Sequence, residues 1–330
     1  MDPSTLSAYS VVAVYSAIAV YAIAFISYVL DLSKRTAVVQ SVRQPMVVAA
    51  GSVVEPTSAV EPVETPGGAV STSSTGGSAT RWQRTAFALT ILGWAVHVAA
   101  LVMRGFAAGR VPWANMYEFA LTGTGIIVGV FLIVQLWRDT RFLGAYITGI
   151  VMLLMGVAAV NFYVPVTPTP PPLQSAWLVI HVFVATLGTG FFAVGGGLSI
   201  AQLLQSRREG GGLQKVRFLR TLPTSEVLET LANRLVIVGF AFWTFTLMAG
   251  AIWADRAWGR YWGWDTKEVW TFIIWVVFAG YIHARATRGW RGNRSAWLAI
   301  IGLGAVLFNF TVVNLFFAGL HSYSGLSTSY

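Results

Sequence analysis

The stretch WADRAWGRYWGWDTKEVW, residues 253–270, holds five tryptophans among six charged side chains whose formal charges sum to zero. Hydrophobic segments flank it on both sides, so we expect it to connect two apolar helices. Tryptophan is common where helix ends meet the interface between membrane and water. The stretch therefore predicts a membrane protein with an unusually aromatic loop at the edge of the bilayer.

The composition agrees with a membrane location. Of the 330 residues, 55% are hydrophobic and only 11% are charged, whereas soluble domains carry about 25% charged residues. A helix of about 20 residues crosses the ~30 Å hydrocarbon core, and in lipid it must satisfy its own backbone hydrogen bonds. We therefore predict an all-α, polytopic membrane bundle of about eight transmembrane helices. The eight hydrophobic segments are 9–30, 84–104, 117–137, 142–164, 175–205, 233–254, 269–288 and 295–318.

The basic residues predict the orientation of these helices. If the first segment starts outside, all but five of the 22 lysines and arginines fall in inner connections, as the positive-inside rule expects. Both termini and the tryptophan-rich stretch are then expected on the outer face. The net charge of +9 therefore reports topology, and nucleic acid is not expected as a partner. The five outer basic residues are Arg104, Arg110, Arg256, Arg260 and Lys267.

The chain divides into three predicted parts. Residues 1–35 form an N-terminal transmembrane helix, which lacks the basic start of a signal peptide and is expected to stay as an anchor. Residues 36–83 are rich in Val, Ser, Thr, Gly and Pro, with no aromatic residue before Trp82, and are expected to form a flexible cytoplasmic linker. Residues 84–330 form the main membrane domain, with the loop 253–270 on its outer side.

Histidines are the candidate metal ligands. The chain has no cysteine, which excludes disulfides and thiolate ligands, and its four histidines are His97, His181, His283 and His321. Histidine is a common axial ligand of haem iron, although a lone histidine in a helix is more often a hydrogen-bonded core residue. His181 lies roughly 9 Å deep from the outer end of its helix, and His321 follows the outer end of the last helix. Two imidazoles near the tryptophans favour haem; the alternative is an interfacial tryptophan belt.

Four segments carry a resemblance to a known family. WGRYWGWDTKEVWTFIIW (258–275) resembles the WWD signature of haem-handling proteins in cytochrome c maturation. PWANMYE (112–118), LVIHVFVATLG (178–188) and FNFTVVNLFFAGLHSYSG (308–325) resemble, in this order, segments of the CcsA family of the system II pathway. The resemblance runs from about residue 84 to 325, so the linker falls outside it.

The resemblance implies a haem-handling domain over residues 84–330. Such a domain binds haem b as a substrate and presents it, at the outer face of a bacterial plasma membrane, to the CxxCH thiols of apocytochrome c. It would be a subunit of a cytochrome c synthase, with no catalytic residue beyond those that position haem. The family pattern implies His181 and His321 as axial ligands of an outer haem iron and His283 as a ligand of an inner one. The aromatic site residues and their acidic neighbour are Trp253, Trp258, Trp262, Trp264, Asp265 and Trp270.

The charged side chains of the loop allow two interpretations. Arg256, Arg260 and Lys267 are expected to meet the haem propionates. Alternatively, Asp265 and Glu268 tie down Lys267 and fix the loop. The sequence does not separate these interpretations.

Partners and rival functions complete the expectations. The resemblance implies a ResB-like membrane protein, apocytochrome c and a thioredoxin-like thiol reductase as partners. One rival is haem transfer to a chaperone, as in CcmC proteins, and another is a solute transporter with an aromatic site. A third is a b-type electron-transfer subunit, which needs histidines paired at one depth. His97 lies about 20 Å above the inner end of its helix and His283 only about 8 Å above its own, so they match poorly.

Overall fold

The computed structural model describes residues 2–41, 80–166, 175–317 and 319–321, and within 35–41 it describes the backbone only. In these ranges, eight helices are long and apolar enough to cross a membrane, which confirms the predicted polytopic helical bundle. The helices are α1 (Pro3–Ser41), α2 (Arg81–Ala108), α3 (Met116–Val134), η1 (Arg141–Leu143), α4 (Gly144–Asn161), α5 (Ala176–Glu209), η3 (Arg217–Thr221), α6 (Ser225–Trp258), α7 (Thr266–Thr287), α8 (Asn293–Phe310) and α9 (Val312–Phe316).

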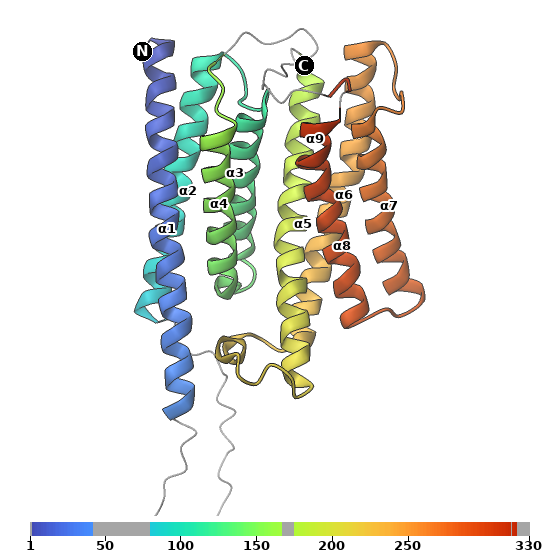
Figure 1. The fold of residues 1–330 in the computed structure, drawn as a ribbon. Helices are drawn as coiled ribbons and strands as arrows, with labels where there is room; N and C mark the ends of the chain where they lie inside the picture. The colour runs from blue at the N-terminus through green and yellow to red at the C-terminus, as the bar shows by residue number, and fades with distance from the viewer. Residues whose placement is uncertain (1, 42–79, 167–174, 318, 322–330) are drawn as a thin grey trace, which may run out of the picture.

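The long helices stand side by side in two groups, α1 to α4 and α5 to α9 (Figure 1). Within the first group α1 packs against α2 and α4, and within the second α5 packs against α6 and α8. The groups meet where α3 packs against α5. Successive long helices alternate in direction, so the connection between α6 and α7 lies at the same end of the bundle as the start of α1 (Figure 1). The predicted topology placed these two features on one side.

The helix ends differ from the predicted segments. The helix α5 has 34 residues, which corresponds to a length of about 51 Å, so it extends beyond the ~30 Å hydrocarbon core. Helix α1 continues to Ser41 and α2 begins at Arg81, so helix covers both edges of the predicted linker 36–83. A helix can continue beyond the membrane through polar and charged residues. Helix ends that are predicted from apolar segments alone therefore fall short of the observed ends. The rest of the linker lies outside the described residues.

Glycines let aromatic side chains pack closely between the helices. A Cβ atom added to Gly144 would lie 2.1 Å from Cζ of Tyr28, so only glycine admits this tyrosine between α1 and α4. In the second group, the rings of Phe192 and Phe278 stack with centroids 3.7 Å apart, and a Cβ atom at Gly302 would clash with Phe278. Small residues at such contacts are typical of membrane helices, whose association depends on close packing.

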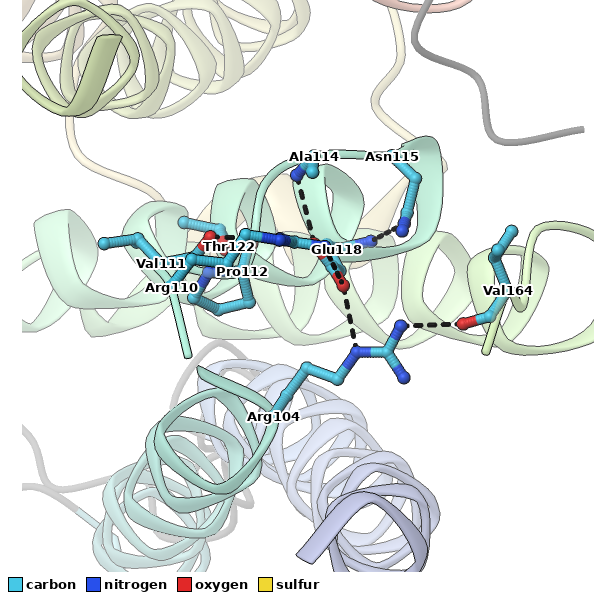
Figure 2. A network of polar contacts seen from close by, with 9 residues as sticks. All are labelled: Arg104, Arg110, Val111, Pro112, Ala114, Asn115, Glu118, Thr122 and Val164. Atoms are coloured by element: carbon cyan, nitrogen blue, oxygen red, sulfur yellow. Dashed lines mark hydrogen bonds and ion pairs between the residues drawn. The ribbon is translucent and has the colours of Figure 1, made fainter. Parts of the chain in front are cut away.

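A buried carboxylate fixes the connection between α2 and α3. Glu118 accepts hydrogen bonds from Nε of Arg104 at 3.0 Å, Nη1 of Arg110 at 2.6 Å and the backbone nitrogen of Ala114 at 3.0 Å (Figure 2). Arg104 also donates to the carbonyl oxygen of Val164, at 2.7 Å, beyond the end of α4. Glu118 and Arg104 are fully buried. Since a buried charge is costly without its partner, the network holds the PWANMYE segment in one conformation.

Removal of this carboxylate should destabilise the bundle strongly. In Glu118→Ala the buried Arg104 loses its counter-charge, and we expect a loss of about 3–5 kcal/mol of stability. Thermal unfolding of the purified protein in detergent measures this loss. Asp139→Ala is the matched control, because Asp139 pairs with Arg141 but its side chain is 58% exposed, and such pairs contribute about 0–1 kcal/mol. Equal unfolding midpoints for the two variants would contradict the structural role of Glu118.

Candidate functional site

A cavity lies between the two helix groups, towards the end of the bundle that carries the tryptophan-rich loop. Along α5 its wall runs from Leu178 to Thr189, a depth of about 16 Å at the helical rise. Most of the lining is apolar or aromatic, as in sites for flat organic ligands. The polar side chains in the wall are Asn115, His181, Thr189, Thr246, Lys267, Glu268, Thr271, Asn309, Asn314 and His321.

His181 lies on α5 with its ring against α6. Its Nδ1 is 3.0 Å from the carbonyl oxygen of Thr246, and since a carbonyl only accepts, Nδ1 carries the proton and donates. The ring stacks on Trp253 with centroids 5.7 Å apart and an angle of 14° between the planes. A Cβ atom at Gly250 would lie 2.7 Å from Cε1 of His181, so this glycine is needed for the ring to reach its place.

His321 approaches the same tryptophan from the segment that follows α9. Its Nδ1 lies 2.7 Å from Oδ2 of Asp265, and its ring meets the rings of Trp253 and Trp258 edge to face, with centroids 5.4 and 4.9 Å apart. The backbone nitrogen of Leu320 donates to Oδ1 of Asp265 at 3.0 Å. The hydrogen bond from His321 lowers the pKa of the Asp265 carboxyl below its ordinary value, so Asp265 stays an anionic acceptor at neutral pH.

The structure therefore brings the two predicted outer ligands to one tryptophan. Trp253 is 2% exposed and contacts both imidazoles. Each ring has Nδ1 held by an oxygen acceptor, and in the part of the chain that the structure describes neither Nε2 has a hydrogen-bond partner. Metal-binding histidines typically donate their other N–H to a carboxylate or a backbone carbonyl in this way. The arrangement suits two imidazoles that bind iron through Nε2; ligation itself remains a prediction.

The loop before α7 is held by its two acidic residues. Asp265 is the N-cap of α7 and forms a capping box with Glu268. Oε2 of Glu268 accepts from the backbone nitrogens of Gly263 and Asp265 at 2.8 and 3.1 Å, and Arg260 pairs with Glu268 at 3.6 Å. Trp264 adopts a left-handed φ of +61°, a strained conformation for a bulky residue. These contacts support the interpretation that the two carboxylates fix the loop. Asp265 accepts from the backbone nitrogen of Lys267, but neither carboxylate forms an ion pair with the Lys267 ammonium among the described residues, since one holds His321 and the other holds the loop and Arg260.

The five tryptophans do not form one continuous platform. Trp253 and Trp262 line the cavity, and Trp258 packs on Trp253 with ring centroids 4.7 Å apart. Trp264 is 76% exposed, and its only ring contact among described residues is with the edge of Trp262. Trp270 packs on Phe308 of α8 and is not in the wall. An interfacial role fits Trp264 and Trp270 better than direct contact with a ligand in the cavity.

The three candidate basic residues also separate. Arg256 is exposed and lies outside the cavity wall, and Arg260 has Glu268 as its counter-ion. Only Lys267 lines the cavity. Its Nζ donates to the carbonyl oxygen of Asn309 at 3.0 Å and to Oδ1 of Asn314.

Several wall residues were not identified from the sequence as site residues. Trp113 and Met116 come from the PWANMYE segment, whose resemblance to a family motif was the available signal. Asn309 near the end of α8 and Asn314 in α9 lie among mostly apolar neighbours, and polar residues within membranes are commonly functional. Thr246 acts on His181 through its carbonyl oxygen, and the residue type does not predict a contact made by a backbone group.

The other two histidines lie away from the cavity wall. His97 on α2 is fully buried, with Nδ1 3.4 Å from the hydroxyl of Tyr21, and it packs inside the first helix group. His283 is exposed on α7, in the second group. The structure thus separates the histidines that a b-type electron-transfer site would have to pair.

Comparisons with known proteins agree with this geometry. Residues 113–321 match the family described as Cytochrome C assembly protein. The chain is 32% identical over 253 residues to the cytochrome c biogenesis protein CcsA of Trieres chinensis, which covers 68% of this chain and 81% of the relative. For the CcsA of Prochlorococcus marinus the identity is 35% over 250 residues, covering 68% and 78%.

The fold is also similar to a solved structure, the cytochrome c haem lyase CcmF, with a TM-score of 0.60. The similarity covers 94% of this chain and 47% of that chain, so this chain spans about half of its length. At 16% sequence identity the likeness concerns the fold alone. From the matched family and the CcsA relatives it follows that this chain is a multi-pass membrane protein that belongs to the CcsA family of cytochrome c biogenesis proteins.

Proposed function

We propose that this chain binds haem b in the cavity and presents it at the outer face of a bacterial plasma membrane for attachment to apocytochrome c. The observation that carries the proposal is the pair of imidazoles at Trp253. Each has Nδ1 held by an oxygen acceptor, and among the described residues neither Nε2 has a hydrogen-bond partner. Membership of a cytochrome c biogenesis family supplies the substrate class. Two histidines are a common axial pair for haem iron.

The residues of the chain act by positioning. His181 and His321 would hold the iron through Nε2, while the Thr246 carbonyl and the Asp265 carboxylate fix the ring orientations and raise the basicity of the ligands. When bound, haem supplies the vinyl groups that react with thiols. This chain has no cysteine, so the thiols belong to the CxxCH motif of apocytochrome c. Positioning of a group that carries its own reactivity is the expected contribution of the protein.

The apolar wall protects the bound group from water. Trp243, Leu247 and Phe310 line the cavity on α6 and α8, and the buried Trp253 of α6 packs against both imidazoles. Tyr261 and Trp262, which are 62% and 37% exposed, lie in the wall where it meets the surface. An incoming peptide would therefore approach the site past these two rings.

The outer location is supported by the distribution of charge. The cavity lies towards the end of the bundle where α6 meets α7. At the opposite end, Arg288 and Arg291 lie in the connection between α7 and α8, and Arg294 lies in the first turn of α8. Basic residues favour the cytoplasmic side. The cavity then faces the compartment in which cytochromes c receive their haem.

The site favours this proposal over its rivals. A b-type electron-transfer subunit would pair His97 with His283, which lie in different helix groups. Haem transfer to a chaperone, as in CcmC, would use the same cavity, but the curated relatives reported above are CcsA proteins and not CcmC proteins. A solute transporter would not require the two oriented imidazoles.

A partner is part of the proposal. His283 is exposed on α7, and among described residues its side chain has no hydrogen bond, while its backbone oxygen accepts from Thr287. We propose that a ResB-like membrane protein packs near α7 and completes an inner iron site with a histidine of its own. A thioredoxin-like reductase would keep the thiols of apocytochrome c reduced.

Replacement of either outer ligand should abolish cytochrome c assembly without unfolding the protein. In His181→Gly or His321→Gly one axial position is empty, so we expect loss of bound haem and of covalent cytochrome c in cells. Added imidazole should restore part of both, because it fills the space left by the side chain. Normal assembly in the double variant, with the protein correctly inserted, would contradict the assignment.

The partner proposal predicts that haem loading depends on the second chain. We expect the chain to retain little haem when expressed alone, to load fully with the ResB-like partner, and to lose loading in His283→Ala. Val276→Ala is the matched control, because Val276 lies two turns away on the same helix and is 47% exposed, so it tests loss of packing without loss of a ligand. Full haem loading and cytochrome c synthesis by this chain alone would refute the shared inner site.

A further inference from the structure

Lys267 differs from the other charged side chains of the cavity wall. In the wall, Glu268 is paired with Arg260, and His321 donates to Asp265. Lys267 has no ion pair with any residue that the structure describes, and its hydrogen bonds go to the neutral oxygens of Asn309 and Asn314. A charged group within a membrane protein is costly unless it is paired. The Asp265 carboxylate acts on Lys267 only at longer range, without an ion pair. An ammonium group whose hydrogen-bond partners are all neutral therefore suits direct contact with an anionic ligand.

The neighbours of Lys267 have unused capacity for hydrogen bonds. The ammonium has three N–H donors, and two of them are directed to Asn309 and Asn314. Oδ1 of Asn309 is buried and has no hydrogen-bond partner among the described residues, although the side chain lines the cavity. Because an amide can turn by 180°, Asn309 can present either its oxygen or its NH2 group to a ligand.

The position of Asn314 is fixed by its surroundings. Its Nδ2 donates to the carbonyl oxygen of Phe310 at 2.9 Å and lies 3.3 Å from Sδ of Met116. The contact with Met116 joins the end of α8 and α9 to the start of α3. A polar corner therefore interrupts a wall that is mostly apolar. It is formed by Lys267 of α7, Asn309 of α8 and Asn314 of α9, and the contact of Asn314 with Met116 connects it to α3. We refer to these three residues as the lysine corner.

We propose that the lysine corner binds a carboxylate, namely a propionate group of haem. This inference rests on the proposed function and adds the orientation of the ligand. Two axial histidines leave the porphyrin free to rotate about the axis that joins them. A charge-assisted hydrogen bond from Lys267 to one edge removes this freedom. Since the vinyl groups lie across the ring from the propionates, the corner holds the reactive edge away from Lys267.

The other basic residues of the loop are weaker candidates for this contact. Arg260 already has a carboxylate partner, and its pairing with Glu268 holds the loop. Arg256 is exposed outside the wall, where a contact with a carboxylate would be screened by water. Among the described residues of the wall, Lys267 is the basic residue that faces the cavity without a direct ion pair.

The test compares haem b with its dimethyl ester, in which both carboxylates are masked. Each pigment is titrated into the purified protein, and the dissociation constant is taken from the absorption change. For each protein, the dissociation constant of the dimethyl ester is divided by that of free haem. Partition of the two pigments into detergent changes this ratio by the same factor in the native protein and in every variant, so a difference between the ratios reports the protein contact. A hydrogen bond to a charged group contributes about 1.5–3 kcal/mol, so we expect Lys267→Met to reduce the preference for free haem by at least about tenfold.

Two further variants separate a carboxylate contact from general damage. Lys267→Arg keeps the positive charge and should retain most of the preference, whereas Arg256→Gln should leave the ratio unchanged. An unchanged ratio in Lys267→Met, or a collapse in Arg256→Gln, would overturn the lysine corner while histidine ligation still stands. A failure of both pigments to give a histidine-dependent spectrum, in the chain alone and in its complex with the ResB-like partner, would instead overturn the proposed function and the corner with it.

Discussion

The hydrogen bond between Nδ1 of His321 and the carboxylate of Asp265 connects the parts of the chain on which the site depends. Asp265 is at once the N-cap of α7, a member of a capping box and the acceptor for the segment that carries His321. The start of α7, the tryptophan-rich loop and the end of the described chain are therefore fixed together. This one carboxylate therefore accepts two hydrogen bonds from the segment after α9, from Leu320 and from His321.

The opposite side of the cavity depends on a second buried carboxylate. Glu118 and its two arginines hold the PWANMYE segment, and this segment places Trp113, Asn115 and Met116 in the wall. The site thus lies between two rigid elements, one from each helix group. Their rigidity suits a protein that orients a reactive group and supplies no reactive group of its own.

The sequence was sufficient for the fold because apolar runs of this length have few alternatives in a bilayer. The number of spanning helices and the juxtaposition of His181 and His321 agree with expectation, the latter through a resemblance. The distribution of the tryptophans did not follow, since Trp270 points to Phe308 and Trp264 to the surface. The sequence also did not predict that the Lys267 ammonium has no ion pair among the described residues. That result depends on a loop conformation in which Glu268 turns back to Gly263 and Arg260. The local sequence gives the charged residues of such a loop, but it does not determine which of them pair with one another.

The central claim is that His181 and His321 bind one iron, and near-infrared magnetic circular dichroism of the ferric, haem-loaded protein tests it most directly. This spectrum distinguishes two imidazole ligands from one imidazole with a thioether, and both from a five-coordinate iron. The distinction matters here because the Met116 thioether also lines the cavity. A low-spin spectrum with two imidazole ligands, lost in His181→Gly and in His321→Gly, is the result that we predict. A histidine–methionine or high-spin spectrum in the native protein would contradict the claim.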